Sequence, residues 1–378
     1  MIKPETFLQS LTRLKLEYFT GVPDSLLKTL CAYITSRIDQ DKHIIAANEG
    51  GAMGLAIGYH LATGKVPVVY MQNSGLGNIV NPLLSMADDQ VYGVPMVLLI
   101  GWRGEMDEDG GQLKDEPQHK KQGQVTEALL NAMDIEYEII HKDTQNSDEV
   151  LERLVERTTS LKRPVAILIR KGTFDAFELP KEEPAKVWSR EEAIATFVNE
   201  IQPDSFVVST TGMPSRELFE QRELRGEPHG SDFLVVGSMG HASQIAAEVS
   251  RQYKSDVYCL DGDGSFLMHM GGVAINAQAE FCHIVLNNGA HDSVGGQPTV
   301  AKNIDIPAIA IACGYKYAMK VETKEDFVTA LKQARLTQSN GACLIEVSVR
   351  KGARSDLGRP TLTSQEMKQG CMQFLQEK

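Results

Sequence analysis

Hydrophobic and polar positions along the chain define two kinds of segment. Short apolar runs rich in β-branched residues predict strands that are buried on both faces. In the first half these runs are HIIAA (43–47), VPVVYM (66–71), PMVLLIG (95–101) and PVAILIR (164–170). Other stretches have a helical repeat of apolar positions, for example LLKTLCAYITSRI (26–38) and DEVLERLVERTTSL (148–161). Strands that alternate with helices predict parallel sheets covered by helices.

The second half of the chain repeats this rhythm. Its predicted strands are SFVVST (205–210), FLVVG (233–237), SDVYCLDG (255–262), FCHIVLNN (281–288) and CLIEVSV (343–349). Both halves also close on a strand followed by Arg-Lys-Gly, in PVAILIRKGTF (164–174) and ACLIEVSVRKGAR (342–354). The pattern therefore predicts an α/β protein with two domains of one architecture, at 1–176 and 191–378. The charged stretch 177–190 contains proline, lacks periodicity and is predicted to be a linker.

Composition limits the partners of the protein. Its 378 residues are 42% hydrophobic and 23% charged, as in ordinary globular proteins. A net charge of −12 opposes binding to nucleic acid and to anionic membranes, so an anionic substrate needs a local basic cluster. The apolar runs are too short to span a bilayer, and the first residues lack the apolar core of a signal peptide. Six scattered cysteines disfavour a zinc site or a disulfide framework. We therefore expect a cytoplasmic protein.

Two polar motifs follow neighbouring predicted strands of the second half. Asp263 lies in DGDGS (261–265), and Asn288 ends the next strand 25 positions later. Because parallel strands end at the same edge of a sheet, both side chains can converge there. Gly262 and Gly264 would let backbone N–H groups approach an anion. Carboxylate, amide and carbonyl oxygens together with phosphate oxygens suit Mg²⁺, whereas the alternative is two unrelated surface turns.

A candidate carboxyl group in the first half is Glu49. It stands between the predicted strand 43–47 and a helix rich in glycine and alanine, within IIAANEGGAMGLAIGYHLATGK (44–65). Burial at this position would favour a protonated carboxyl group. The alternative is a solvated glutamate that interacts with the dipole of the helix.

These motifs resemble those of thiamin diphosphate enzymes. GDGS followed by NN is similar to the sequence that holds the cofactor through Mg²⁺ in that family, and Glu49 with its helix resembles the catalytic glutamate motif. YMQNSGLGNIVNPL (70–83) resembles the next loop of the pyrimidine-binding domain. The resemblance implies a pyrimidine-binding domain followed by a diphosphate-binding domain, with no middle domain. It is closest to compact thiamin diphosphate-dependent decarboxylases that act on phosphonopyruvate, and next to those that act on sulfopyruvate.

The resemblance also assigns cofactor residues. The metal would be bound by the side chains of Asp263 and Asn288 and by the backbone of Ala290. Further cofactor contacts would come from Gly262, Gly264, Ser265, Gly240 and Ser74, with His291 and Ser293 near the diphosphate. Leu218, or failing that Met213, would wedge between the two rings of the cofactor. Glu49 would share a proton with the aminopyrimidine and so favour an ylide, which attacks a 2-oxo acid and becomes an enamine when CO₂ leaves.

Substrate residues follow from the same resemblance. Asp24 and Ser25 would lie on the reaction side, and His119 would protonate the enamine. The basic candidates for the substrate tail are Arg103, Lys120 and Arg354, with Lys121, Lys351 and Arg359 nearby in sequence. Residues 101–123 resemble a lid. The family geometry implies a homo-oligomer, at least a dimer, whose site combines the first domain of one chain with the second domain of another.

The expected reaction converts the small anionic 2-oxo acid 3-phosphonopyruvate into phosphonoacetaldehyde and CO₂. Decarboxylation of sulfopyruvate or of another 2-oxo acid stays open, because arginine and lysine bind both anionic tails. From a different class, a non-catalytic protein that binds nucleotides or phosphate also stays open, because DGDGS alone would permit it.

Overall fold

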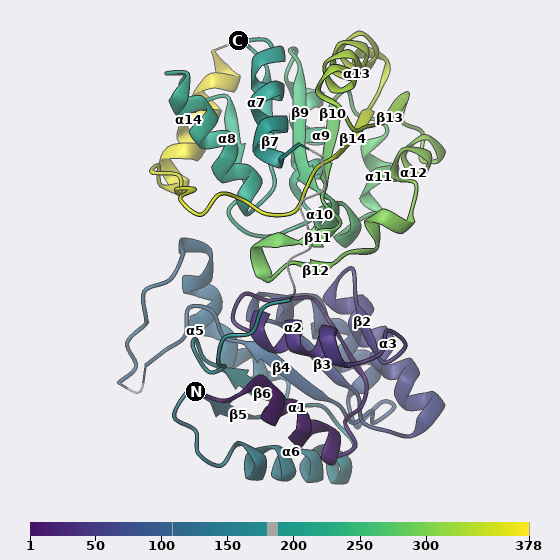
Figure 1. The fold of residues 1–378 in the computed structure, drawn as a ribbon, viewed down its shortest axis with the longest axis vertical. Helices are drawn as coiled ribbons and strands as arrows, with labels where there is room; N and C mark the ends of the chain where they lie inside the picture. Colours follow the sequence, from purple (N-terminus) through teal and green to yellow (C-terminus); the bar gives the residue numbers. More distant parts are fainter. Residues whose placement is uncertain (108, 180–187, 378) are drawn as a thin grey trace. The chain divides into compact units, whose positions relative to one another are not determined.

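The computed structural model describes residues 1–107, 109–179 and 188–377. The described residues form two compact units: an N-terminal unit up to residue 179 that includes 294–297, and a C-terminal unit with the remainder from 188 onward. In each unit, helices flank a six-stranded sheet (Figure 1). The domain limits 1–176 and 191–378 stay predictions. The expected linker 177–190 falls largely on residues 180–187, which lie outside the described residues.

The sheet of the N-terminal unit is entirely parallel, with the strand order β2-β1-β3-β4-β6-β5. Its strands are β1 (Phe19–Gly21), β2 (His43–Ile45), β3 (Val68–Gln72), β4 (Val97–Gly101), β5 (Glu136–Ile140) and β6 (Val165–Ile169). Its helices are α1 (Pro4–Arg13), α2 (Lys28–Arg37), α3 (Glu49–Thr63), η1 (Asn73–Gly75), α4 (Leu76–Pro82), η2 (Leu83–Ala87), α5 (Pro117–Ala132) and α6 (Ser147–Leu161).

Successive side chains along these strands point to opposite faces of the sheet, and each face packs against helices to form its own hydrophobic core. Val68 and Tyr70 of β3 face one core, which also contains buried residues of α1, α2 and α6. Val69 and Met71 face the other core, with buried residues of α3 and α4. Strands covered by helices on both faces must be apolar at successive positions, which explains the continuous hydrophobic runs in the sequence.

The C-terminal unit has a second parallel sheet, in the order β8-β7-β9-β10-β14-β13. Its strands are β7 (Phe206–Ser209), β8 (Asp232–Leu234), β9 (Val257–Gly262), β10 (Cys282–Asn287), β13 (Tyr317–Val321) and β14 (Cys343–Ser348). Its helices are α7 (Arg190–Glu200), α8 (Met213–Leu224), α9 (Ala242–Gln252), α10 (Asp263–Met268), α11 (Gly272–Asn276), η4 (Val300–Asn303), α12 (Ile306–Ala312), α13 (Lys324–Thr337), η5 (Gln338–Asn340) and α14 (Ser364–Gln376). Between residues 290 and 298 lie β11 (Ala290–His291), η3 (Asp292–Val294) and β12 (Gln297–Pro298).

The two units share one connectivity. When the six sheet strands are numbered along the chain within each unit, both sheets have the order 2-1-3-4-6-5. The expected α/β fold with two similar parallel sheets is confirmed. No helix in the described parts of the chain has the length and apolar character needed to cross a membrane.

Three strands of the two six-stranded sheets were absent from the sequence prediction, namely β1, β5 and β13. Strands β5 and β13 each lie at an edge of their sheet, and their residues are mostly half-buried or exposed. Edge strands pair on one side only and carry polar residues, so they lack the apolar signal of central strands. Strand β1 spans three residues, which is too short for a periodic pattern.

A buried histidine makes the N-terminal unit sensitive to pH. His43 is 8% exposed, and its Nε2 lies 2.9 Å from the hydroxyl of Tyr70. Burial lowers the pKa of His43 from 6.5 to about 4. Between these values the unfolded chain binds a proton that the folded chain does not, so stability is lost as the pH falls from 6.5 towards 4. When this loss is complete, the free energy of unfolding has fallen by about 3 kcal/mol.

We expect His43→Gln to flatten this pH dependence, because glutamine stays neutral and can still bond Tyr70. The chain has two tryptophans, and Trp102 belongs to the N-terminal unit, so Trp188→Phe makes fluorescence specific for that unit. Urea unfolding at pH 4.5 and pH 7 in this background measures the effect. Equal pH dependence with and without His43→Gln would contradict the assignment.

Candidate active site

Glu49 is the first residue of α3 and is held in a buried position. The side chain of Asn48 accepts a hydrogen bond from the Gly51 N–H at 2.8 Å, which caps the helix. Glu49 is 6% exposed, and its Oε2 accepts a hydrogen bond from Asn78 Nδ2 at 2.7 Å. Asn78 lies in α4 and was not predicted, although it ends the motif NSGLGN.

Gly75 provides the space for this carboxyl group. A Cβ atom at Gly75 would lie 2.7 Å from both Cγ and Oε1 of Glu49, which is too close for any real contact. The predicted cofactor residue Ser74 lies beside it in η1, where its hydroxyl accepts a hydrogen bond from Gln72 Nε2 at 2.7 Å. The turn after β3 thus shapes the surroundings of Glu49.

A second polar group of the N-terminal unit centres on Arg103, which follows β4. The Asp115 carboxylate binds Nε of Arg103 at 2.8 Å and also binds Nη2, while Nη1 donates to the Ser25 hydroxyl at 2.8 Å. Asn73 holds the arginine backbone, accepting from its N–H at 3.1 Å and donating to its carbonyl at 2.9 Å. The structure therefore brings together Ser25 and Arg103, two of the predicted substrate residues, and their role in substrate binding stays a prediction. Asp115 and Asn73 were not predicted.

Two further predicted residues adjoin this group. Asp24 is 1% exposed and accepts backbone hydrogen bonds from Leu26 and Leu27. Burial raises the pKa of Asp24, although Arg103 acts in the opposite direction. Burial and then the Arg103 charge lower the pKa of His119, so its imidazole is neutral at neutral pH. A neutral ring is a weak acid, which modifies the proton-donor role expected for His119.

The last seven residues of the expected lid, 117–123, are helical. Helix α5 begins at Pro117, so His119, Lys120 and Lys121 lie on its first two turns. Proline at the first helical position explains the helix start, because its missing N–H has no intrahelical partner to lose. Lys120 and Lys121 are exposed, whereas His119 is buried.

In the C-terminal unit, Asp263 begins α10 directly after β9. It is 2% exposed, and its carboxylate accepts hydrogen bonds from the Thr299 hydroxyl and from the backbone N–H of Asn288. Burial is the main cause that raises the pKa of Asp263 to about 6, and the negative charge of Asp292 adds to it. A buried carboxylate of this kind is stabilised by a cation.

The DGDGS segment is not a turn: strand β9 ends at Gly262 and helix α10 begins at Asp263. Gly262 is extended, with φ −106° and ψ 160°. Gly264 is required for packing, since a Cβ there would lie 2.9 Å from the imidazole of His291. His291, predicted near the diphosphate, therefore contacts this segment.

Asn288 lies beside Asp263 at the end of β10. Its Oδ1 accepts the Ala290 N–H at 2.9 Å, and its Nδ2 donates to Asp292 at 2.7 Å. Gly289, which lies between Asn288 and Ala290 in the chain, has φ +67°, a conformation that glycine adopts readily. The carboxylate of Asp263, the amide oxygen of Asn288 and the Ala290 carbonyl are hard oxygen donors, and this donor set fits Mg²⁺.

Ser265 links two segments at this edge of the sheet. Its Oγ lies 3.0 Å from the Thr210 hydroxyl and accepts the Gly240 N–H at 3.0 Å. Gly240 has φ +90°, and a Cβ there would lie 2.6 Å from His269. The predicted residues Ser265 and Gly240 are thus neighbours, and Thr210 after β7 is an addition to the set.

Other predicted residues are less well placed for contact with a ligand. Leu218 has no exposed surface and packs in the hydrophobic core, whereas Met213 is half-buried at the start of α8. Arg354 forms ion pairs with Glu191, Glu220 and Asp356, so its charge is already compensated. Ser293 is exposed, as are Lys121 and Arg359, while Lys351 is half-buried.

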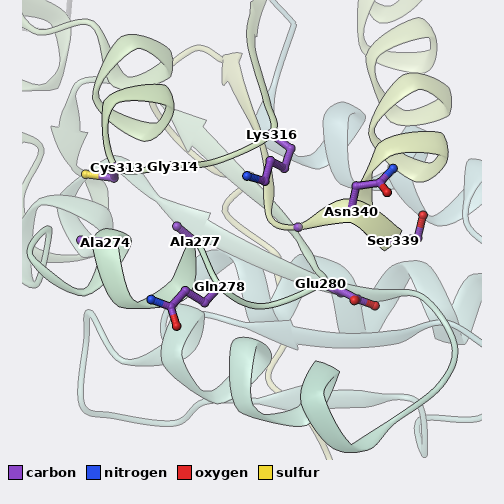
Figure 2. A pocket seen from close by; sticks show the side chains of 10 residues that line it. Ala274, Ala277, Gln278, Glu280, Cys313, Gly314, Lys316, Ser339 and Asn340 are labelled. Carbon is purple, nitrogen blue, oxygen red and sulfur yellow. The ribbon is translucent and has the colours of Figure 1, made fainter.

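Two other features of the C-terminal unit are not part of the predicted site, although Asp261 in the first of them belongs to DGDGS. Cys259, Asp261 and His283 bring atoms able to bind a metal within 4.8 Å of one another, but Asp261 and His283 already bond each other at 3.1 Å in the core. A pocket of about 420 Å³ is lined by Glu280, Lys316 and Asn340, with the latter two drawn above Glu280 in Figure 2. These three residues precede β10, β13 and β14, so the pocket lies at the opposite ends of the strands from Asp263.

Comparison with known proteins identifies the family. The description "Thiamine pyrophosphate enzyme, N-terminal TPP binding domain" matches residues 4–126, and the corresponding C-terminal TPP binding domain matches residues 211–347. The chain belongs to the thiamine pyrophosphate (thiamin diphosphate) enzyme family. This confirms the family predicted from the sequence, its two-domain fold and thiamin diphosphate as cofactor.

Members of the family with named activities cover the whole chain. A phosphonopyruvate decarboxylase of Streptomyces hygroscopicus is 32% identical, over 100% of this chain and 95% of the relative. One of Streptomyces viridochromogenes is 31% identical, over 97% and 93%. A sulfopyruvate decarboxylase of Methanosarcina acetivorans is 26% identical, over 87% of each chain. The protein is thus a member of the decarboxylase branch of the thiamin diphosphate enzymes.

Gly75→Ala is expected to displace the carboxyl group of Glu49, the predicted catalytic residue, and to lower kcat by about 10-fold or more, since a small misplacement of a catalytic group costs this much. The affinity for thiamin diphosphate should change less, because Gly75 lies in the N-terminal unit whereas the predicted diphosphate motif, DGDGS, lies in the C-terminal unit. Gly77→Ala is the matched control, because a Cβ at Gly77 meets nothing within 4 Å. Steady-state kinetics and calorimetric titration with thiamin diphosphate measure both effects. Equal kcat values for the two variants would contradict the role of Gly75.

Proposed function

We propose that this chain decarboxylates 3-phosphonopyruvate to phosphonoacetaldehyde and CO₂. Similarity to two phosphonopyruvate decarboxylases over nearly their full length supports this proposal. The sulfopyruvate decarboxylase is less similar and is covered over less of its length. The observation that carries the proposal is the half-buried Arg103 group, which can bind an anionic tail.

Arg103 retains donors for such a tail. Its guanidinium has five N–H groups, and among the described residues Asp115 and Ser25 take three of them. Two N–H groups remain to bind two oxygens of a phosphonate or sulfonate group, a charge-assisted contact. His119 and Asp24 belong to the same group, and an anion bound there would raise the pKa of His119 and so promote its protonation. Lys120 and Arg354 become secondary candidates because the first is exposed and the second is paired.

The C-terminal unit is proposed to hold the cofactor through Mg²⁺. The metal ligands are Asp263, Asn288 and the carbonyl of Ala290, and the donor set supports this assignment. The proposed diphosphate contacts are Gly262, Gly264, Ser265 and Gly240, with Ser74 on the N-terminal unit. Of the two candidates for the residue between the cofactor rings, we propose Met213, since Leu218 has no exposed surface.

Thiamin diphosphate, when bound, supplies the carbon nucleophile and accepts the electrons released with CO₂. Glu49 is proposed to share a proton with N1′ of the aminopyrimidine, and its hydrogen bond from Asn78 fixes the carboxyl group for this task. Arg103 and Ser25 orient the substrate tail. The chain therefore contributes position and charge, while the cofactor carries the chemistry.

A homo-oligomer, at least a dimer, is also proposed. The outer face of α3 exposes Gly51, Gly54, Leu55, Gly58 and Leu61, and leucines 55 and 61 are 37% and 74% exposed. Small residues at this spacing allow a second helix to approach closely, and exposed leucines favour its burial. The cytoplasmic location stays a prediction.

Substrate assays test the proposed reaction. We expect CO₂ release from 3-phosphonopyruvate that requires thiamin diphosphate and Mg²⁺. The kcat/KM for pyruvate should be lower by a factor of about 100 or more, because pyruvate leaves the Arg103 donors unpaired. Arg103→Gln combined with Asp115→Asn removes the cation without leaving a buried carboxylate unpaired, and should abolish this preference. Lys120→Gln, which removes an exposed cation of α5, is the control. Faster turnover of sulfopyruvate than of 3-phosphonopyruvate would reverse the assignment.

Complementation tests whether the site is shared by two copies. Glu49→Gln and Asp263→Ala should each be inactive alone. In a mixed dimer one site then carries both changes and the other carries neither, so co-expression should restore about a quarter of the parent activity in a symmetric dimer. Persistent inactivity of the mixture, with both variants folded and mixed dimers isolated by two different tags, would contradict a shared site.

A further inference from the structure

Asp292 accepts several hydrogen bonds beside the proposed metal ligands. Three donors bind its Oδ2: Asn288 Nδ2 at 2.7 Å, Arg190 Nη1 at 3.0 Å and the Gly352 N–H at 2.9 Å. These donors come from the end of β10, the start of α7 and the segment after β14. The Asp292 side chain is only 12% exposed. It therefore connects the segment 288–292, which contains the proposed ligands Asn288 and Ala290, to two other parts of the C-terminal unit by hydrogen bonds.

Arg190 is itself fixed on both sides. Its side chain is 4% exposed and forms two hydrogen bonds with Glu217, at 2.7 and 2.9 Å. Ser189 and Glu192 form a capping box at the start of α7, so the backbone at Arg190 is also fixed. Because its Nε and Nη2 bind Glu217, the guanidinium can direct Nη1 only towards Asp292. The pair Arg190 and Glu217 thus orients the Asp292 carboxylate.

Two contacts orient the Asn288 amide: the Ala290 N–H donates to its Oδ1, and the Asp292 carboxylate accepts from its Nδ2. A carboxylate only accepts hydrogen bonds, so the NH₂ group of Asn288 must point towards Asp292 and the amide oxygen away from it. The amide oxygen is the atom that binds a hard cation. With asparagine at position 292, a neutral oxygen would replace the carboxylate that accepts from Asn288, and this hydrogen bond would be weaker because it loses its charge assistance.

We propose that Asp292, held by Arg190 and Glu217, is a positioning residue that keeps the Asn288 amide oxygen directed to the metal. This rests on the proposed function, which makes Asn288 a metal ligand. Partners behind metal ligands commonly change metal affinity 10- to 100-fold when they are removed. The network also has a net charge of −1, from one arginine and two carboxylates, which favours a cation nearby.

Metal binding tests the proposal without reference to turnover. The full chain is titrated with Mn²⁺ as a Mg²⁺ substitute in the presence of saturating thiamin diphosphate, and free Mn²⁺ is measured by electron paramagnetic resonance. Asp292→Asn is expected to weaken Mn²⁺ binding by about 10- to 100-fold. Arg190→Lys is expected to weaken it in the same direction, because lysine cannot bind Glu217 and Asp292 in the same fixed geometry. This second variant keeps the test decisive if Asp292→Asn does not fold.

Arg222→Lys provides the matched control for loss of a buried arginine. Arg222 pairs with Asp232 through two hydrogen bonds of 2.8 and 2.9 Å and also binds Glu227, all away from the Asn288 loop. It should lower the unfolding midpoint as Arg190→Lys does, yet leave Mn²⁺ affinity unchanged. Mn²⁺ affinity at the parent value in folded Asp292→Asn, or an equal loss in Arg222→Lys, would overturn the positioning role. Absence of Mn²⁺ binding by the parent protein would overturn the metal site and this role together.

Discussion

A parallel sheet brings the carboxyl ends of its strands to one edge, and this constraint places the candidate residues of both units. In the N-terminal unit, Glu49 follows β2 and Arg103 follows β4. In the C-terminal unit, Asp263 follows β9 and Asn288 follows β10. Helices cover both faces of each sheet, so polar groups at this edge are removed from water and must be satisfied by one another. The hydrogen-bond networks described above are a consequence of that burial.

Charges at these edges are compensated to different degrees. Arg103 is paired with Asp115, and Arg190 with Glu217 and Asp292. Asp263 differs, because within the described residues it has hydrogen bonds from a hydroxyl and from backbone amides but no ion pair. Its pKa of about 6 reflects this incomplete compensation. A bound cation would compensate this charge, which agrees with the proposed role of Asp263 as a metal ligand.

Sequence alone predicted the central strands because their burial on both faces leaves continuous apolar runs. It missed β5 and β13 because edge strands carry polar residues, and it did not anticipate that the segment 101–123 becomes helical from Pro117 onward. Spacing relative to strand ends was enough to single out Glu49 and Asp263. Their partners Asn78 and Thr299 lie 29 and 36 positions away and have no local signal. Such contacts depend on how distant segments pack.

The repeated fold also explains how two different sites arise from one design. In each unit, the side chain directly after the third strand accepts the backbone N–H of a residue after the fourth strand. Asn73 does so with Arg103, and Asp263 does so with Asn288. An amide also donates, so Asn73 binds the Arg103 carbonyl as well and fixes the arginine. A carboxylate cannot donate and retains lone pairs, so the equivalent position with aspartate favours a cation. The side chain at this shared position therefore differs in what it can bind: Asn73 fixes the Arg103 backbone, whereas Asp263 can accept from a backbone amide and still bind a cation.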